Sequence, residues 1–542
     1  MSVLRPLELV FHSTPNNHNR MHTSTFPAAL LALLLASCQS PTDEQLAPQP
    51  TPDPTEALSS QQLDAQIINT LRETGQFDWN KATAHFVWSA LTRSDYVLSV
   101  GYQPAGCTGT LPADAAGSSA WQEARAQVLA LILAEERKAR PELTLAQLTA
   151  YEEKVLPVVD VTVRQLSTIK ALRASKLVRY AEPMGYEPNR PTDAANKGAS
   201  SLSSSGCGNN VAMPGLLPNE DFTVLPGGSK SSWNQANQYH GIRAAWSQST
   251  GQGIKVLIID TGCSANQENL GAAFNQGQST GRTVERLVTL PRTTFLGIPT
   301  GPVETPDDDC GHGTSMAGAC AAPRGTDGAS VGVAYNANLI VVRAAEDVFL
   351  DGSREVKGVA DAYILAGNRP DVRIISMSMG RLTSSGQMTD AIHYAYTRGK
   401  LILCAAGTSF DWSAGLVGVI YPASLPEAVA VTGVKDNLTT RCDECHVGAD
   451  VEFSVVMQRS SNDLRALTLA MDGDDPSTVG GSSVATSSMA GMTALVWSRY
   501  PTETRAQIMS RLVAASSNRN ARSSSFGWGR VNVAAAVGVP SL

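Results

Sequence analysis

Residues 254–262 read IKVLIIDTG, and this stretch decides the fold. Four consecutive apolar residues, Val256–Ile259, are followed by Asp260 and a turn glycine. A short, continuously apolar run that ends in turn residues is typical of a strand buried on both faces of a parallel sheet. Similar runs follow at 337–344 (ANLIVVRA), 372–380 (VRIISMSMG), 401–407 (LILCAAG) and 428–434 (AVAVTGV). Helical patterns lie between several of them, so we expect an α/β domain with a mostly parallel, twisted sheet and helices on both faces.

The bulk composition excludes some classes of function. The chain has 542 residues, of which 42% are hydrophobic and 17% charged, and this length allows roughly two to four domains. The net charge is −7, and no basic patch indicates nucleic acid as a partner. Any partner must therefore be inferred from sites rather than from overall charge.

The N-terminal segment predicts export. Residues 26–38, FPAALLALLLASC, form an apolar run that is too short to span a bilayer and ends in small residues. The last four residues resemble a bacterial lipobox, in which Cys38 would carry the lipid. We expect residues 1–38 to be a signal peptide with a lipobox, although an ordinary signal peptide with an incidental cysteine is the alternative. Residues 39–60, rich in proline, would then tether a protein of the bacterial cell envelope, lipid-anchored or secreted.

The next two regions differ in composition. Residues 61–190 contain helical patterns at 64–75, 121–139 and 145–155, and then a strand–helix–strand pattern at 156–183. This pattern predicts a smaller α+β domain. Residues 191–230 form a linker that includes the Ser/Gly-rich stretch 194–210, which would be open to proteolysis.

Polar residues gather where ligands bind in such sheets, at the carboxyl ends of the strands. Asp260 closes the first strand, and a carboxylate there is costly unless something pairs with it. Taken alone, Asp260 would be interpreted as a cap of the next turn. His312 follows in GHGTSMAG (311–318), and serines follow in GGSSVATSSMAG (480–491), which gives the order Asp, His, Ser.

With these motifs, residues 231–542 resemble the subtilisin-like serine peptidases, or subtilases. The resemblance implies a three-layer subtilisin-like domain and an acyl-enzyme mechanism. Ser483 would be the nucleophile, His312 its base and Asp260 the residue that orients the imidazole. Family members carry a glycine two residues before the nucleophile and another eight after it, which Gly481 and Gly491 provide.

Three other serines compete with Ser483. Ser482 is its neighbour, and Ser488 does not have the glycine spacing. Ser315 lies in GTSMA, which is the family's signature around the nucleophile, but it follows His312 by three residues on the same expected helix. It would lack a separate turn whose N–H groups could face an oxyanion, so we interpret Ser315 as a packing residue.

The resemblance also implies residues that bind substrate. Ser378 and Gly380 would pair with an extended substrate backbone, and Ala405, Ala406 and Gly407 would form a wall of the specificity pocket. The Ser483 backbone N–H would help to bind the oxyanion. The family's second donor is an asparagine, which is Thr408 in this chain, with Ser409 as a substitute. A catalytically impaired relative that binds peptides or proteins is therefore the alternative function.

The family is made with a propeptide, and residues 156–183 resemble the closing half of one. We expect self-cleavage between Met184 and Phe222, so the chain's own propeptide would be a partner besides polypeptide substrates. An unrelated helical adaptor is the alternative for residues before about 150.

No cofactor is required for this chemistry. Residues 442–446 spell the CxxCH pattern of c-type haem attachment, but a surface disulfide or an isolated pair is the favoured interpretation. Residues 307–309 (DDD) could suggest the calcium that subtilases often bind, although a solvated acidic loop is favoured and no metal ligand is assigned. Cys263 and Cys310, each close to an expected catalytic residue, could form a disulfide. Cys320 and Cys404 are expected to be buried thiols.

Overall fold

A computed structural model of the chain describes residues 56–107, 111–112, 115–188, 207–208, 210–295, 298–408 and 418–539. The expected signal peptide with Cys38, most of the tether, residues 189–206 of the expected cleavage region and Ser409 lie outside the described residues. Among the helices that are described, none is both long and apolar enough to cross a bilayer.

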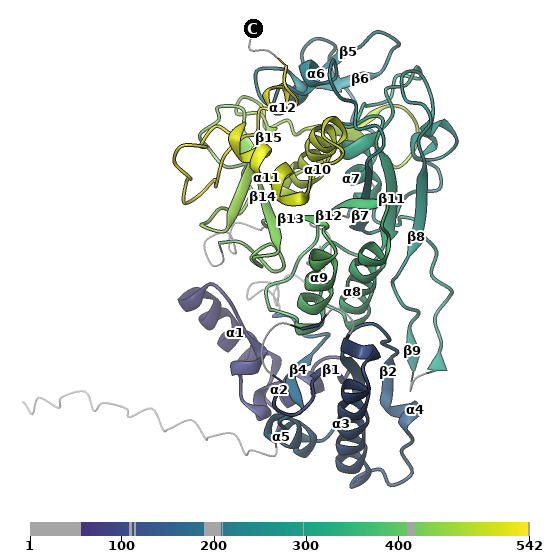
Figure 1. Ribbon diagram of the computed structural model, residues 1–542, viewed down its shortest axis with the longest axis vertical. Coiled ribbons are helices and arrows are strands. Elements are labelled where there is room, and N and C mark those ends of the chain that lie inside the picture. The colour runs from purple at the N-terminus through teal and green to yellow at the C-terminus, as the bar shows by residue number, and fades with distance from the viewer. Residues whose placement is uncertain are drawn as a thin grey trace, which may run out of the picture. The chain divides into compact units, whose positions relative to one another are not determined.

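The core of the molecule is a seven-stranded sheet in which every neighbouring pair of strands is parallel (Figure 1). The strand order is β15-β14-β13-β12-β7-β11-β8. Its strands are β7 (Lys255–Asp260), β8 (Val284–Val288), β11 (Asn338–Arg343), β12 (Val372–Met377), β13 (Leu401–Ala405), β14 (Ala428–Lys435) and β15 (Val451–Gln458). The α/β fold and the mostly parallel sheet expected from the sequence are confirmed.

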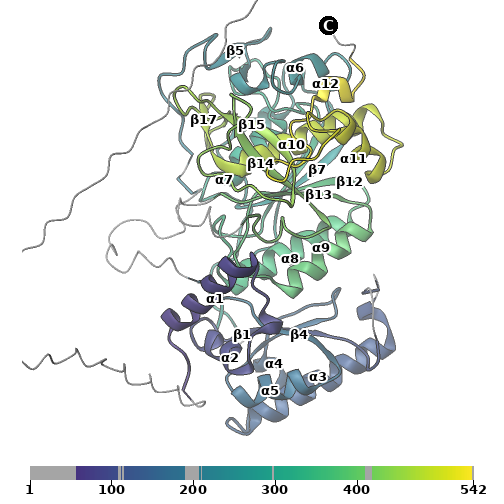
Figure 2. The same cartoon turned by 90° about the vertical axis from the view of Figure 1, so that its left-hand side faces the viewer.

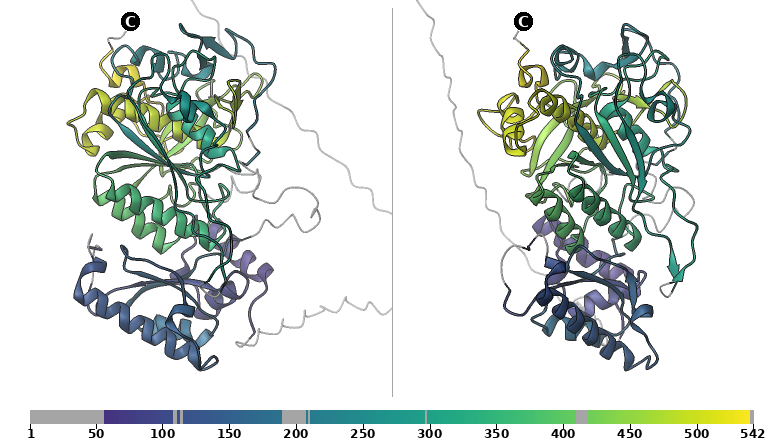
Figure 3. Two further views of the ribbon diagram at one scale, coloured as in Figure 1. Left: turned by 90° about the vertical axis from the view of Figure 1, so that its right-hand side faces the viewer. Right: turned by 45° about the vertical axis from the view of Figure 1, so that its right-hand side comes forward.

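Two hydrophobic cores lie on opposite faces of this sheet, because successive side chains of a strand alternate. Val256 and Ile258 of β7 pack in the core that contains α7 and α10, whereas Leu257 and Ile259 pack in the core that contains α8 and α9. Figure 3 shows helices on both sides of the sheet. They are α6 (Ile242–Ala245), α7 (His312–Ala321), α8 (Ser353–Asn368), α9 (Gly386–Thr397), α10 (Gly481–Arg499), α11 (Arg505–Ala514) and α12 (Val533–Ala536).

The two edge strands, β8 and β15, are absent from the sequence expectations. Every residue of β8 is only partly buried, and its sequence VERLV lacks the continuous apolar run of the central strands. Three short antiparallel pairs complete the domain. They are β5 (Phe222–Val224) with β6 (Lys230–Ser232), β9 (Thr294–Phe295) with β10 (Ile298–Pro299), and β16 (Leu467–Leu469) with β17 (Pro476–Thr478).

Residues 56–188 form a separate antiparallel sheet with the order β2-β3-β1-β4 and helices against one face. Its elements are α1 (Ser60–Thr74), α2 (Ala84–Thr92), β1 (Val97–Tyr102), α3 (Ser119–Arg137), α4 (Leu145–Leu148), β2 (Thr149–Tyr151), β3 (Val158–Thr162), α5 (Leu166–Ala174) and β4 (Val178–Pro183). The helix expected over 145–155 is wrong, because it stops after one turn and Thr149 then pairs with Val161 of β3.

The helices and the sheet of residues 56–188 share one core. Leu63 of α1 and Trp121 of α3 pack in the same cluster as Val159 and Val161 of β3. The region is therefore one structural unit, and the alternative of a separate helical adaptor before residue 150 finds no support in the packing.

The other face of this small sheet contacts α8 and α9 (Figure 2). Polar and charged side chains meet there. The Arg179 guanidinium pairs with Asp390 at 2.6 Å, and Lys357 pairs with Glu153 at 2.9 Å. We call the region 56–188 the N-terminal domain.

Candidate active site

The end of β7 brings Asp260 against His312, the first residue of α7. Asp260 Oδ1 lies 2.7 Å from His312 Nδ1. The alternation of β7 that directs Val256 and Ile258 toward α7 also directs Asp260 there. The two side chains are 0% and 2% exposed, respectively, so this pair is shielded from water.

The surroundings of His312 favour its charged form. Burial alone would lower the pKa of the imidazole, but the charge of Asp260 and the hydrogen bond to it more than compensate. Asp308 and Asp347 add smaller effects in the same direction, and the net result is a raised pKa. Because Nδ1 faces the carboxylate, the proton of neutral His312 resides on Nδ1, and Nε2 is left as the basic atom.

Asp308 organises the turn before His312. One of its carboxylate oxygens accepts hydrogen bonds from the Thr261 hydroxyl and the Gly311 N–H, and the other accepts from the N–H and the hydroxyl of Thr314. Asp308 is only 1% exposed. The expected solvated acidic loop at 307–309 is therefore wrong for this residue, which instead stabilises the start of α7.

Ser483 lies in the first turn of α10. It follows Gly481, which has a φ of +75° and lies so close to the Thr408 side chain that a Cβ atom would collide with it. The Ser483 hydroxyl donates to the Ser378 carbonyl at 3.4 Å, and the Ser378 hydroxyl donates to the Ser483 carbonyl at 3.0 Å.

Ser378 connects this serine to the buried pair. It directly follows Met377, which is the register partner of Ile259, and so lies at the same sheet edge as Asp260. The described residues thus bring Ser483, His312 and Asp260 to one edge. Within this described site, the hydroxyl of Ser483 is turned to Ser378 and makes no hydrogen bond to His312.

Thr408 lies beside the same helix end. Its Oγ1 accepts the Ser482 N–H at 3.0 Å and lies 3.1 Å from the Ser482 hydroxyl oxygen. That hydroxyl also accepts the Gly407 N–H at 3.1 Å. Ser482 is therefore engaged in holding residues 407 and 408 against α10.

The surroundings of Ser315 are those of a packing residue. It is fully buried, and its hydroxyl donates to the Leu469 carbonyl at 3.0 Å. The Thr468 hydroxyl in turn donates to the Ser315 carbonyl. These contacts tie α7 to β16 and agree with the interpretation of Ser315 as a packing residue.

The expected substrate-binding edge is occupied by the chain itself. The Gly380 N–H donates to the Val348 carbonyl at 3.1 Å, and the Gly380 carbonyl accepts the Leu350 N–H at 3.0 Å. The two segments pair in parallel through Phe349 and Gly380. A substrate could use these groups of Gly380 only after residues 348–350 move.

The expected pocket wall follows β13. Ala405 ends this strand, and both backbone groups of Ala406 are bonded, to the Val431 carbonyl and the Ile420 N–H. Both backbone groups of Gly407 are bonded as well, to the Ser482 hydroxyl and the His446 N–H. The wall is thus held from several elements.

The disulfides differ from one expectation. Cys310 pairs with Cys207 and not with Cys263, which remains a buried thiol. Cys442 pairs with Cys445, which agrees with the disulfide favoured for the CxxCH pattern, but both cysteines are buried and do not lie at the surface. The expected buried thiols are also found, at Cys320 and Cys404.

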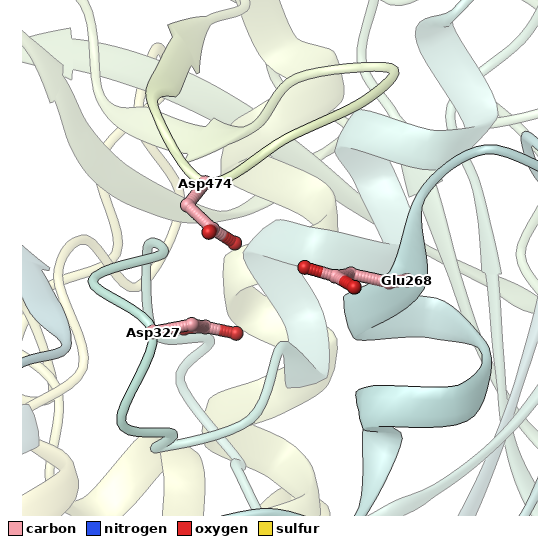
Figure 4. Close-up of side chains that lie close together, drawn as sticks. All are labelled: Glu268, Asp327 and Asp474. Carbon is pink, nitrogen blue, oxygen red and sulfur yellow. The ribbon is translucent and has the colours of Figure 1, made fainter.

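Three carboxylates from separate segments of the chain lie close together. One oxygen each of Glu268, Asp327 and Asp474 lies within 4.8 Å of the others (Figure 4). Burial, and the charge of Asp327 after it, raise the pKa of Asp474. This group is separate from residues 307–309.

Comparison with known proteins places this geometry in context. The subtilase family model matches residues 251–529. Subtilisin DY from Bacillus licheniformis is 30% identical over 296 residues, which cover 53% of this chain and 91% of the relative. Subtilisin from Bacillus sp. (strain TA39) is 29% identical over 294 residues, and the match spans only 64% of that protein and 50% of this chain. The crystal structure of MycP1 from Mycobacterium smegmatis is 21% identical, with a TM-score of 0.44, over 62% of this chain and 89% of that structure.

Proposed function

Because this chain belongs to the subtilase family, we propose that it is a serine endopeptidase whose catalytic residues are Asp260, His312 and Ser483. The observation that carries the proposal is the buried Asp260–His312 pair at the sheet edge that also holds Ser483. In this pair, Asp260 Oδ1 lies 2.7 Å from His312 Nδ1. A buried carboxylate that orients a histidine near a serine at a helix start is the arrangement that acyl transfer requires.

The first chemical step would transfer the Ser483 proton to His312 Nε2 while Oγ attacks the peptide carbonyl. The charge of Asp260 stabilises the imidazolium that forms, and the imidazolium then protonates the leaving amine. The hydroxyl must first turn away from the Ser378 carbonyl, which accepts it at 3.4 Å. A substrate N–H that donates to the same carbonyl would release the hydroxyl toward His312.

The oxyanion would lie at the start of α10, where the Ser483 N–H and the helix dipole stabilise negative charge. Thr408 would supply the second donor. Its Oγ1 accepts the Ser482 N–H, and if the Ser482 hydroxyl donates to it as well, the Thr408 hydrogen is available for the oxyanion.

We also propose that the protein is exported, anchored through Cys38 and made as a proenzyme whose N-terminal domain is its propeptide. The contacts of Met184, Tyr186 and Glu187 with Arg381, which follows Gly380 in the chain, support a cleavage site farther along the chain. A cut before Cys207 would leave the Cys207–Cys310 disulfide within the mature enzyme, and a cut after Cys207 would keep both products linked.

The test is covalent labelling with a fluorophosphonate probe, which reacts only with an activated serine. We expect labelling of the wild type, complete loss in Ser483→Ala and retention in Ser315→Ala, whose lost hydrogen bond costs only about 1 kcal/mol of stability. Digestion and mass spectrometry would locate the label.

A peptide-binding relative without turnover is the second candidate. It is favoured by the hydroxyl of Ser483 facing Ser378 and by the occupied Gly380 edge. Folded, processed protein that fails to label would contradict the endopeptidase and support this candidate.

A further inference from the structure

The carboxylate of Glu187 is bound by three consecutive residues of the catalytic domain. The Arg381 guanidinium lies 2.8 Å from Oε1, and the Leu382 N–H donates to Oε2 at 2.9 Å. The N–H of Thr383 donates to Oε1 at 3.2 Å, and the Thr383 hydroxyl donates to the same oxygen. We call residues 381–383 the carboxylate receptor.

Arg381 also binds the main chain that carries this glutamate. Its guanidinium donates to the carbonyls of Met184 at 3.1 Å and Tyr186 at 3.2 Å. The side chains of Arg381 and Glu187 are 0% and 1% exposed, respectively. The receptor thus recognises a peptide segment by its backbone and by one carboxylate, with water excluded while the N-terminal domain is docked.

The receptor directly follows the expected substrate edge, Ser378–Gly380, in the chain. It is held in place independently of Glu187, because the Arg381 N–H donates to the Tyr421 carbonyl at 3.0 Å. A polypeptide that lies along the edge and continues away from Ser483 would therefore pass residues 381–383.

We propose that the carboxylate receptor is a subsite of the mature enzyme that selects substrates with an acidic side chain upstream of the scissile bond. This inference rests on the proposed function, because it requires cleavage beyond Glu187 and departure of the N-terminal domain. Glu187 occupies the subsite in the precursor, and a substrate glutamate or aspartate replaces it afterward.

The chemistry of the receptor explains the selectivity. When Glu187 leaves with the N-terminal domain, the Arg381 guanidinium and two peptide N–H groups lose their acceptor, and a charged carboxylate is the partner that binds such donors most strongly. A substrate carboxylate accepts from all of these donors. A glutamine is a poor substitute, because its NH₂ group would face other donors, and a lysine would bring a second positive charge.

The experiment compares peptides that differ only in this side chain. Processed enzyme is given fluorogenic peptides with Glu, Gln or Lys at successive positions before the scissile bond. We expect one position at which kcat/KM for Glu exceeds that for Gln by about tenfold or more, with Lys lowest, since hydrogen bonds to charged groups are the strong ones. In Arg381→Gln this ratio should fall to near one.

If Arg381→Gln does not fold, Thr383→Val is the alternative test variant. Valine keeps the shape of the threonine side chain and removes one hydrogen-bond donor to the carboxylate. It should lower the Glu/Gln ratio at the same position several-fold. A ratio near one at every position, in enzyme that labels with the fluorophosphonate, would overturn the subsite and leave the proposed function intact. Absence of both labelling and cleavage would instead overturn the proposed function, and the subsite with it.

A second measurement needs no turnover. In the full chain with Ser483→Ala, Glu187→Gln should lower the melting temperature, and the effect should be much smaller in an Arg381→Gln background. Additive effects of the two substitutions would contradict recognition of the carboxylate by Arg381.

Discussion

Ser315 and Ser483 have the same side chain but different surroundings. The Ser315 hydroxyl is buried and donates to the Leu469 carbonyl, so it has neither access to substrate nor a base. Ser483 lies at a helix start, beside the strand end that holds Asp260. The difference in reactivity expected for the two serines therefore comes from position and not from the hydroxyl itself.

The pKa of His312 gives a prediction at the scale of one residue. As the catalytic base, His312 must be neutral, so kcat/KM should fall when the pH drops through its raised pKa. Asp347 contributes to that raised pKa by its charge. Asp347→Asn should therefore shift the acid limb of the pH profile of kcat/KM to lower pH, by roughly a few tenths of a unit.

The matched control is Asp309→Asn, because the Asp309 side chain is 83% exposed and is paired with Arg343. Burial raises the pKa of Asp347 itself to about 6, so the shift should be measured with profiles that extend well above that pH. An acid limb that moves equally in both variants would contradict a specific role of Asp347.

Thr408 gives the second prediction at this scale. Its hydroxyl is engaged with Ser482 and has a shorter reach than the amide of an asparagine. In the related subtilisin, loss of one oxyanion donor costs about 10²–10³ in kcat. Thr408→Asn should therefore raise kcat by about tenfold or more, in single-turnover measurements with little change in KM. If kcat of Thr408→Asn is unchanged or lower, and kcat of Thr408→Val is lower still, the Thr408 hydroxyl is already an effective oxyanion donor.

At the scale of elements, the site depends on two helices that begin at one sheet edge. α7 starts with His312 after Gly311, and α10 starts at Gly481, where the left-handed backbone and the contact with Thr408 exclude larger residues. The Ser482 N–H at this helix start donates to Thr408, whereas the Ser483 N–H is the group that would bind an oxyanion.

The pairing of residues 348–350 with Gly380 predicts a local opening. The amides of Leu350 and Gly380 should exchange slowly with deuterium in the free protein, because each donates within the pair. A tight-binding peptidyl inhibitor should displace residues 348–350, so exchange at Leu350 should rise by at least about tenfold while Gly380 stays protected by the inhibitor. The amides of α9 are the internal reference. Unchanged protection at Leu350 in the inhibited enzyme would mean that substrate binds elsewhere.

At the scale of the whole molecule, buried carboxylates lie between the N-terminal domain and α9. Burial is the main cause that raises the pKa of Asp160 and of Glu182 to about 7. Asp160 Oδ2 accepts a hydrogen bond from Gln387 at 2.8 Å, and Glu182 Oε2 accepts one from the Gly386 N–H at 2.6 Å. Asp160 Oδ1 has no hydrogen-bond partner among the described residues, which suits a neutral acid.

These raised pKa values predict that docking of the N-terminal domain depends on pH. A carboxyl whose pKa is higher in the docked state than in the free domain binds its proton more tightly when docked. Protonation therefore stabilises the docked state, fully below the ordinary carboxyl pKa near 4, and this stabilisation is lost as the pH rises to about 7. After processing, the N-terminal fragment should therefore dissociate at least about tenfold faster at pH 8 than at pH 5, as followed by size-exclusion chromatography without reductant.

Asp160→Asn keeps the shape of the side chain and should flatten this dependence, whereas Glu123→Gln, exposed on α3, should not. Dissociation that is faster at pH 5 would contradict the sign of the coupling. Products that separate only with reductant would place the cut after Cys207.

The sequence by itself determined the central strands, the helices between them and the order of Asp260, His312 and Ser483, because these features are encoded in local periodicity and short motifs. It also favoured Ser483 over Ser315, because Ser315 follows His312 by three residues on the same expected helix and lacks a separate turn. The edge strands β8 and β15 were not predicted, because β8 is only partly buried and polar residues interrupt the apolar pattern of both strands. Only the tertiary structure decided the partner of Cys310, the burial of Asp308, the pairing of Gly380 with Leu350 and the binding of Glu187 by Arg381. The last two partners stand 30 and 194 residues apart in the chain, and contacts over such distances arise from packing, which local sequence patterns do not report.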